Sequence, residues 1–282
     1  MKWFEQIQVR YFALVWVGLT FYLPGGDLLA STLLYNAPWY GWILGFWYYQ
    51  YTLVILALAA TVLTPAHTPI KVIVGPQPTA TQMRPSLAFT LFLFPLSMVC
   101  LYVMYLPLSY IAPDFVNYWL IDLPDWIYFE GDQLLFLPNV ATLVITCVVA
   151  PVVEEFAFRG VILHRWTHKY GLWPAILWSS LLFAVVHPDI LGAFTFGIGM
   201  CILYLRTQSL WVPILCHSAY NLFVWCWDLT FMFIDGPDFV YTLETLQSGW
   251  PWGAAAAVIV VVWAALYLRR PRPPVTWTLP AL

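Results

Sequence analysis

An uncharged segment that ends in a pair of carboxylates constrains this chain more than any other feature. Residues 133–153 contain no charged side chain, Glu154 and Glu155 follow directly, and Arg159 comes four residues after Glu155. An ionised side chain at membrane depth costs on the order of 3 kcal/mol or more, and two adjacent carboxylates also repel each other. The fold must therefore supply partners for these carboxylates, or the carboxylates must carry out chemistry.

The composition places this segment in a membrane. Of the 282 residues, 62% are apolar and 9% are charged, whereas a soluble domain has about 25% charged residues. The polar surface is therefore too small to coat a soluble globule of this length. We predict an all-α polytopic membrane protein, which excludes a nucleic-acid-binding role and makes membrane lipid a partner.

Eight apolar segments have close to the ~20 residues that a helix needs to cross a bilayer. We interpret the chain, residues 1–282, as a single integral membrane domain with a disordered tail at 271–282. The connection 64–86 is predicted to be irregular, and 107–138 to be an outer-interface loop that includes short amphipathic helices. The predicted spans are 11–33, 42–63, 87–106, 139–158, 173–188, 190–206, 211–228 and 251–268.

The distribution of positive charge predicts the orientation of these spans. With the N-terminus in the cytoplasm and eight crossings, all eleven Lys and Arg residues fall on cytoplasmic segments. Cytoplasmic loops of membrane proteins carry such an excess of Lys and Arg. The outer segments collect acidic residues instead. We therefore expect both termini to be cytoplasmic.

The spans of the second half contain a small set of strongly polar residues. Residues four apart share a helix face, and this spacing relates Glu155 to Arg159, Phe183 to His187, and His217 to Asn221. Taken singly, an intramembrane histidine is often a packing residue. A His and an Asn on one helix face can form hydrogen bonds to a neighbouring helix, worth about 0.6 kcal/mol each. Taken together with the glutamate pair, these residues favour a functional site. The candidates are Glu154, Glu155, Arg159, His187, His217 and Asn221.

Such a set can hydrolyse a peptide bond without a serine or cysteine nucleophile. One glutamate takes a proton from a water molecule, and the water attacks a carbonyl. Histidine and asparagine donate hydrogen bonds to the oxyanion that develops. Arg159 can hold the second glutamate as an ion pair, which offsets the cost of burying it.

A metal is the competing use of these side chains. His164 and His168 have the spacing of the HExxH zinc motif, but Arg165 stands where that motif requires glutamate. Glu154, His187 and His217 could instead form a three-ligand zinc site. We predict no metal and no cofactor, and keep a zinc-dependent membrane protease as an alternative.

The three spaced pairs resemble the motifs of a known family. Glu154-Glu155-x-x-x-Arg159, Phe183-x-x-x-His187 and His217-x-x-x-Asn221 are similar to the three motifs of the CPBP family, which comprises CAAX prenyl proteases of type II and bacteriocin-processing (Abi) proteins. The resemblance covers residues 139–228, the motif-bearing core. Each motif is weak alone, whereas all three in order on separate spans are fairly specific.

The resemblance implies a glutamate-type intramembrane endopeptidase. Glu154 would be the base that activates water, with Glu155, Arg159 and Phe183 in support. His187 would position the water or stabilise the oxyanion, and His217 and Asn221 would complete the oxyanion site. The implied partner is a membrane-associated protein or peptide substrate; a lipidated protein, a protein with a C-terminal sorting helix and a leader peptide are all compatible. The implied location is the cell membrane, a bacterial inner membrane.

Two non-peptidase interpretations remain open at this point. The first is a non-catalytic membrane partner, such as a bacteriocin self-immunity protein that retains the motifs. The second is a transporter that uses Glu, Arg and His as a relay, although the sequence lacks the inverted repeats typical of that class.

The peptidase interpretation makes two demands on the fold. If the fourth span ended at residue 158, Glu154 and His187 would lie at opposite faces of the membrane. The helix must therefore continue to about His168, which places Glu154 in its middle. We also expect a cavity between the fourth, fifth, sixth and seventh spans.

Overall fold

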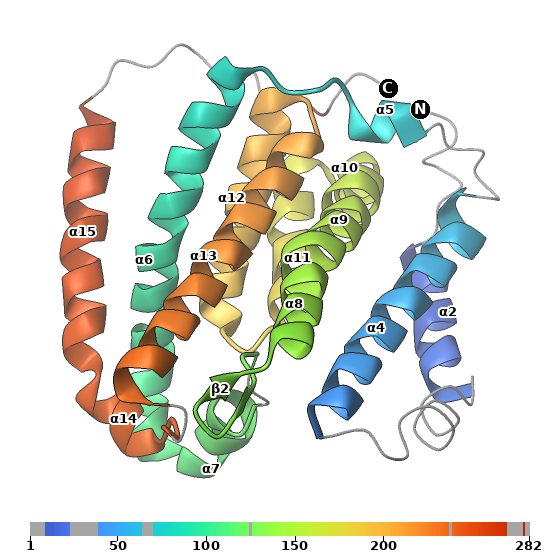
Figure 1. The fold of residues 1–282 in the computed structure, drawn as a ribbon. Helices are drawn as coiled ribbons and strands as arrows, with labels where there is room; N and C mark the ends of the chain where they lie inside the picture. Colours follow the sequence, from blue (N-terminus) through green and yellow to red (C-terminus); the bar gives the residue numbers. More distant parts are fainter. Residues whose placement is uncertain are drawn as a thin grey trace.

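The protein is described here by a computed structural model, which covers residues 9–22, 39–63, 70–123, 126–236, 239–269 and 279. Within these ranges the chain forms a bundle of long helices with one small hairpin (Figure 1). The hairpin consists of β1 (Phe129–Glu130) and β2 (Gln133–Leu134), which pair antiparallel.

One long helix, the composite helix, runs from Phe136 to Tyr170. Its parts are α8 (Phe136–Val144), η3 (Ile145–Val149), α9 (Ala150–Glu155), η4 (Phe156–Ile162) and α10 (Leu163–Tyr170), where η marks a π-helical segment. The elements before it are α2 (Val9–Tyr22), α4 (Trp39–Leu58), η1 (Ala59–Leu63), α5 (Ile70–Val74), α6 (Ala80–Ile111), α7 (Pro113–Val116) and η2 (Asn117–Ile121). Those after it are α11 (Leu172–Ala184), α12 (Ile190–Thr207), α13 (Trp211–Asp235), α14 (Leu243–Ser248) and α15 (Trp250–Leu268).

Every predicted span overlaps one of these helices, and the all-α prediction is confirmed for the described residues apart from the hairpin. Among the described residues, five helices are long and apolar enough to cross a bilayer, and α2 and α11 include shorter apolar segments. The number of eight crossings and the cytoplasmic side of the termini stay predictions. Part of the first span, and all of the predicted tail except residue 279, lie outside the described residues.

Several predicted boundaries were wrong. The helix of the third span begins at Ala80 and ends at Ile111, so 64–86 is not wholly irregular and 107–138 is not wholly a loop. The connection to the composite helix includes the hairpin as well as short helices. The fifth helix ends at Ala184, because the proline at position 188 removes an N–H and disfavours helix in the residue before it. The seventh helix continues to Asp235.

The predicted continuation of the fourth helix is present. The composite helix passes Arg159 without a break and ends at Tyr170. Gly171 follows with a φ of 88°, a left-handed conformation that glycine adopts without strain, and its N–H donates to the Thr167 carbonyl. This turn lets α11 fold back along the composite helix, so that the two helices lie side by side (Figure 1).

The helix α12 lies at the centre of the bundle and packs closely on α11. In its apolar segment Ile190–Thr207, 56% of the residues are buried, compared with 11% in the apolar segment of α15, Trp250–Tyr267. A Cβ added to Gly197 would lie 3.0 Å from Ser180 Cβ and 3.1 Å from Ser180 Cα. The glycine therefore permits the close approach, as expected for small residues at helix interfaces in membranes.

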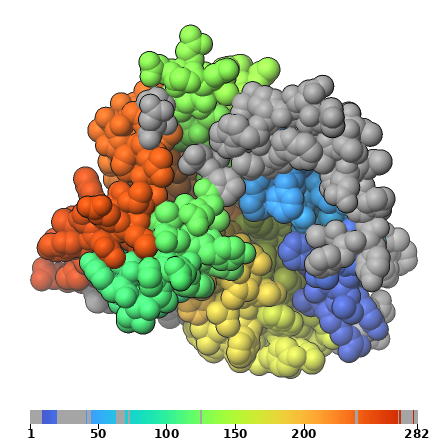
Figure 2. Space-filling model, turned by 90° about the horizontal axis from the view of Figure 1, so that it is seen from below, coloured from blue at the N-terminus to red at the C-terminus, as the bar shows by residue number. Residues whose placement is uncertain are grey.

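The two ends of the bundle differ in charge. The α5 helix, the start of α6, and the ends of α10 and α15 lie at the upper end in Figure 1 and carry Lys71, Arg84, Lys169 and Arg269. The α7 helix, the hairpin and α14 lie at the lower end and carry acidic residues. Figure 2, seen from that end, shows the α7 region between the start of α15 and the α11–α12 turn. The basic residues from which the cytoplasmic side was predicted thus lie at one end of the bundle.

Candidate active site

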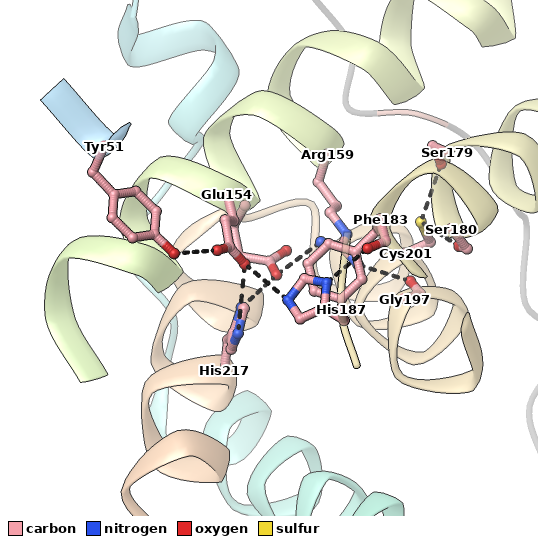
Figure 3. A network of polar contacts seen from close by, with 11 residues as sticks. Tyr51, Glu154, Arg159, Ser179, Ser180, Phe183, His187, Gly197, Cys201 and His217 are labelled. Carbon is pink, nitrogen blue, oxygen red and sulfur yellow. Dashed lines mark hydrogen bonds and ion pairs between the residues drawn. The ribbon is translucent and has the colours of Figure 1, made fainter. Parts of the chain in front are cut away.

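The composite helix places Glu154 in the interior of the bundle (Figure 3). The Glu154 side chain is 16% exposed, and its two oxygens have different surroundings. Oε1 accepts a 2.6 Å hydrogen bond from the Tyr51 hydroxyl. Oε2 has no hydrogen-bond partner among the described residues, but faces His187 Nε2 at 3.9 Å and His217 Nε2 at 4.0 Å. The three predicted groups therefore meet.

His187 lies in the turn that follows α11. Its backbone N–H donates to the Ala184 carbonyl, and its ring Nδ1 lies 2.7 Å from the Phe183 carbonyl oxygen. A carbonyl oxygen only accepts, so Nδ1 must carry the proton, which is the usual way a histidine satisfies a carbonyl at a helix end. The Phe183 ring also stacks on the imidazole, with the centroids 4.2 Å apart. Nδ1 is therefore occupied as a donor, and Nε2 is the ring nitrogen that faces Glu154.

His217 is held by the second glutamate. Its Nδ1 lies 2.9 Å from Glu155 Oε1, and the same oxygen accepts a 2.9 Å hydrogen bond from Arg159 Nη1. Because Glu155 is ionised against Arg159, the imidazole donates through Nδ1. Nε2 of His217 is therefore turned to Glu154.

Glu155 and Arg159 form a buried ion pair. Their side chains are 0% and 1% exposed. Such a pair is stable only where further contacts replace the lost water. Arg159 Nη2 donates to the Gly197 carbonyl at 3.1 Å, and the guanidinium lies 4.8 Å from the centre of the Phe183 ring. The predicted support by Glu155, Arg159 and Phe183 thus corresponds to a connected set of contacts.

Asn221 contacts the composite helix about two turns before Glu154. Its Nδ2 donates a 2.7 Å hydrogen bond to the Thr146 carbonyl. In the π-helical segment η3, the Ala150 N–H donates to Ile145, five residues back. The next residue in that register is Pro151, which has no N–H, so the Thr146 carbonyl needs another donor. Asn221 therefore forms an interhelical hydrogen bond in this structure, and the second hydrogen of its amide group remains available for another acceptor.

The comparisons with known proteins concern this same part of the chain. A family model for type II CAAX prenyl endopeptidase Rce1-like proteins matches residues 136–223. We call residues 136–223 the Rce1-like segment because of this match. It contains Glu154, Glu155, Arg159, His187, His217 and Asn221, so the Rce1-like segment includes the whole predicted set.

Two curated relatives match over similar lengths. The putative membrane peptidase YdiL of Bacillus subtilis is 34% identical over 85 residues, which cover 29% of this chain and 35% of that protein. The UPF0177 protein YbdI of Lactococcus lactis is 30% identical over 93 residues, which cover 32% of this chain and 50% of that protein. The similarity thus spans half or less of each relative. No solved structure matches significantly.

A pocket is lined by residues of the Rce1-like segment, but it differs from the cavity we expected. It has a volume of about 300 Å³ and lies between the composite helix and α13. Two of the four helices that we predicted to enclose the cavity contribute to it. Its lining is almost wholly apolar: Leu143, Val144, Cys147, Val148, Ser218, Ala219 and Leu222.

No pattern in the sequence pointed to Tyr51. It is one of 17 tyrosines, it lies on α4, and it is outside the Rce1-like segment. No helical spacing relates it to another polar residue of the site. Only the packing of α4 against the composite helix brings its hydroxyl to Glu154. In the described part of the chain, no group of three or more His, Cys, Asp or Glu side chains is arranged to hold a metal ion.

Proposed function

We propose that this protein is an intramembrane endopeptidase in which Glu154 activates a water molecule for attack on a peptide bond. The observation that carries the proposal is the gap between Glu154 Oε2, His187 Nε2 and His217 Nε2. The glutamate oxygen lies 3.9 and 4.0 Å from the two nitrogens. These separations are too long for direct hydrogen bonds but suit a water that lies about 2.8 Å from each atom.

The charges of the site support a division of labour between the histidines. Glu155 is paired with Arg159, and Glu154 is the carboxylate that faces the gap. The donor role falls to His217, because its Nδ1 faces the Glu155 carboxylate, whereas Nδ1 of His187 faces a neutral carbonyl. His217 then donates through Nε2, and His187 accepts through Nε2.

The reaction follows from these roles. The water donates one hydrogen bond to Glu154 and one to His187, and its oxygen attacks the carbonyl carbon while Glu154 takes the proton. His217 and the remaining amide hydrogen of Asn221 donate to the oxyanion. When the C–N bond breaks, Glu154 returns the proton to the leaving amine, and the site regains its starting charge.

The proposed substrate is a membrane-associated protein or peptide in a bacterial inner membrane. The partial exposure of Glu154 and His187, 16% and 31%, supports access to the site. The apolar pocket between the composite helix and α13 supports contact with an apolar segment of the substrate. Prenylated, sorting-helix and leader-peptide substrates all satisfy these conditions.

The test compares cells that produce the native chain with cells that produce Glu154→Gln in equal amounts. New protein N-termini in the membrane fraction are measured by mass spectrometry. We expect a set of cleavages that the native chain produces and the variant does not. If the two membrane fractions have the same N-termini, the peptidase proposal is wrong, and the non-catalytic partner becomes the better interpretation.

A further inference from the structure

The two oxygens of Glu154 are not equivalent, and Tyr51 is the reason. The Tyr51 hydroxyl donates to Oε1 at 2.6 Å, while Oε2 is left to face the two histidines. Figure 3 shows Tyr51 and His217 on different sides of the carboxylate. The hydroxyl comes from α4, which lies outside the Rce1-like segment.

A carboxylate that lacks such a bond is free to turn. The terminal torsion of a glutamate side chain is broad and roughly two-fold, so the two oxygens can exchange places. A short hydrogen bond to one oxygen fixes the plane of the group and so directs the other oxygen. In this site the directed oxygen is Oε2, the one that borders the gap between the imidazoles.

The bond is not needed merely to attach α4 to the composite helix. Tyr48, one turn earlier on α4, already donates to the Ala141 carbonyl of the composite helix at 3.1 Å. The two tyrosines thus make the same kind of bond between the same two helices. They differ in the acceptor: a structural backbone carbonyl for Tyr48, and the proposed catalytic carboxylate for Tyr51.

We infer that Tyr51 is a positioning residue, which fixes the Glu154 carboxylate with Oε2 toward the water. The inference rests on the proposed function for the identity of the base. The ionisable groups that face Glu154 are Tyr51 on α4, His187 after α11 and His217 on α13, with Glu155 and Arg159 on its own helix.

The first test needs no substrate. Infrared spectra of the purified full-length protein in lipid are recorded for the native chain and for Glu154→Gln, and the difference identifies the Glu154 carboxylate band. We expect this band to shift in Tyr51→Phe and to stay in place in Tyr48→Phe, the matched control. A band that does not move in Tyr51→Phe overturns the inference, whether or not the protein cleaves any substrate.

The second test uses a substrate identified by the N-terminus comparison. Tyr51→Phe should lower kcat about tenfold with little change in KM, because only the alignment of the base is lost. Tyr48→Phe should retain the native kcat and KM.

The outcomes separate this inference from the proposed function. Cleavage that persists in Glu154→Gln contradicts the proposed function, while the infrared shift still decides the role of Tyr51. Cleavage that requires Glu154, together with a native kcat in Tyr51→Phe, contradicts the role of Tyr51 alone.

Discussion

Glu155 Oε1 accepts a 2.9 Å hydrogen bond from His217 Nδ1, although the two residues are 62 positions apart in the chain. The same glutamate oxygen also holds Arg159. This bond gives the two ring nitrogens of His217 different roles: Nδ1 is structural, and Nε2 remains available for chemistry. It also explains why two glutamates occur together. Glu155 pairs with Arg159 and orients His217, and Glu154 faces the gap between the imidazoles.

The two halves of His217 can be separated by substitution. The amide nitrogen of asparagine occupies nearly the position of Nδ1, so His217→Asn should retain the bond to Glu155 and lose Nε2. We expect unchanged thermal stability in detergent and a loss of cleavage of about 100-fold or more. His217→Ala, which loses both nitrogens, should lower both quantities. Native turnover in His217→Asn would contradict an oxyanion role.

The buried ion pair should dominate the stability of the site. Arg159→Met leaves Glu155 buried without its cationic partner, and the cost of such a change is about 3–5 kcal/mol. The melting temperature of the purified variant should therefore fall sharply. The double variant Glu155→Gln with Arg159→Met should recover part of the loss, because it buries no uncompensated charge. Equal melting temperatures for Arg159→Met and the native chain would contradict this account.

Asn221 combines a visible structural role with a proposed catalytic one. In Asn221→Ala, the Thr146 carbonyl loses its donor, which should cost about 1 kcal/mol of stability. If the second amide hydrogen also serves the oxyanion, cleavage should fall by about 100-fold or more, far beyond the effect on stability. A variant that is slightly less stable but turns over at the native rate would assign Asn221 to helix packing alone.

A chelator distinguishes the glutamate mechanism from the zinc alternative. Glu154, His187 and His217 are all possible zinc ligands by residue type. We predict that purified protein dialysed against a strong chelator retains its cleavage rate. A loss of activity that added zinc restores would show that these three residues hold a metal, and the water would then be activated by the ion.

Much of the helical layout could be read from the sequence, because apolar length and charge distribution are local signals. The meeting of Glu154 with His187 and His217 also followed, once the fourth helix was extended beyond Arg159. Helix ends were less predictable: α6 begins at Ala80, before the predicted span 87–106, since a helix continues past its most apolar segment when its ends are satisfied by other contacts.

Tertiary contacts account for the rest of the differences. The bond from Tyr51 to Glu154 depends on how α4 packs, for which no sequence spacing exists. The bond from Asn221 to Thr146 depends on a π-helical register around Pro151, which is a property of the folded helix. The pocket lies between the composite helix and α13 because their side chains leave a gap there, which depends on packing in three dimensions.

The central claim, that Glu154 is the base, is tested most directly by a rate measurement on matched proteins. The native chain and Glu154→Gln are reconstituted in the same lipid, shown to have equal melting temperatures, and given one identified substrate at equal concentration. The account predicts that the variant is slower by at least about 100-fold. A Glu154→Gln protein that cleaves the substrate at a rate close to native would contradict it.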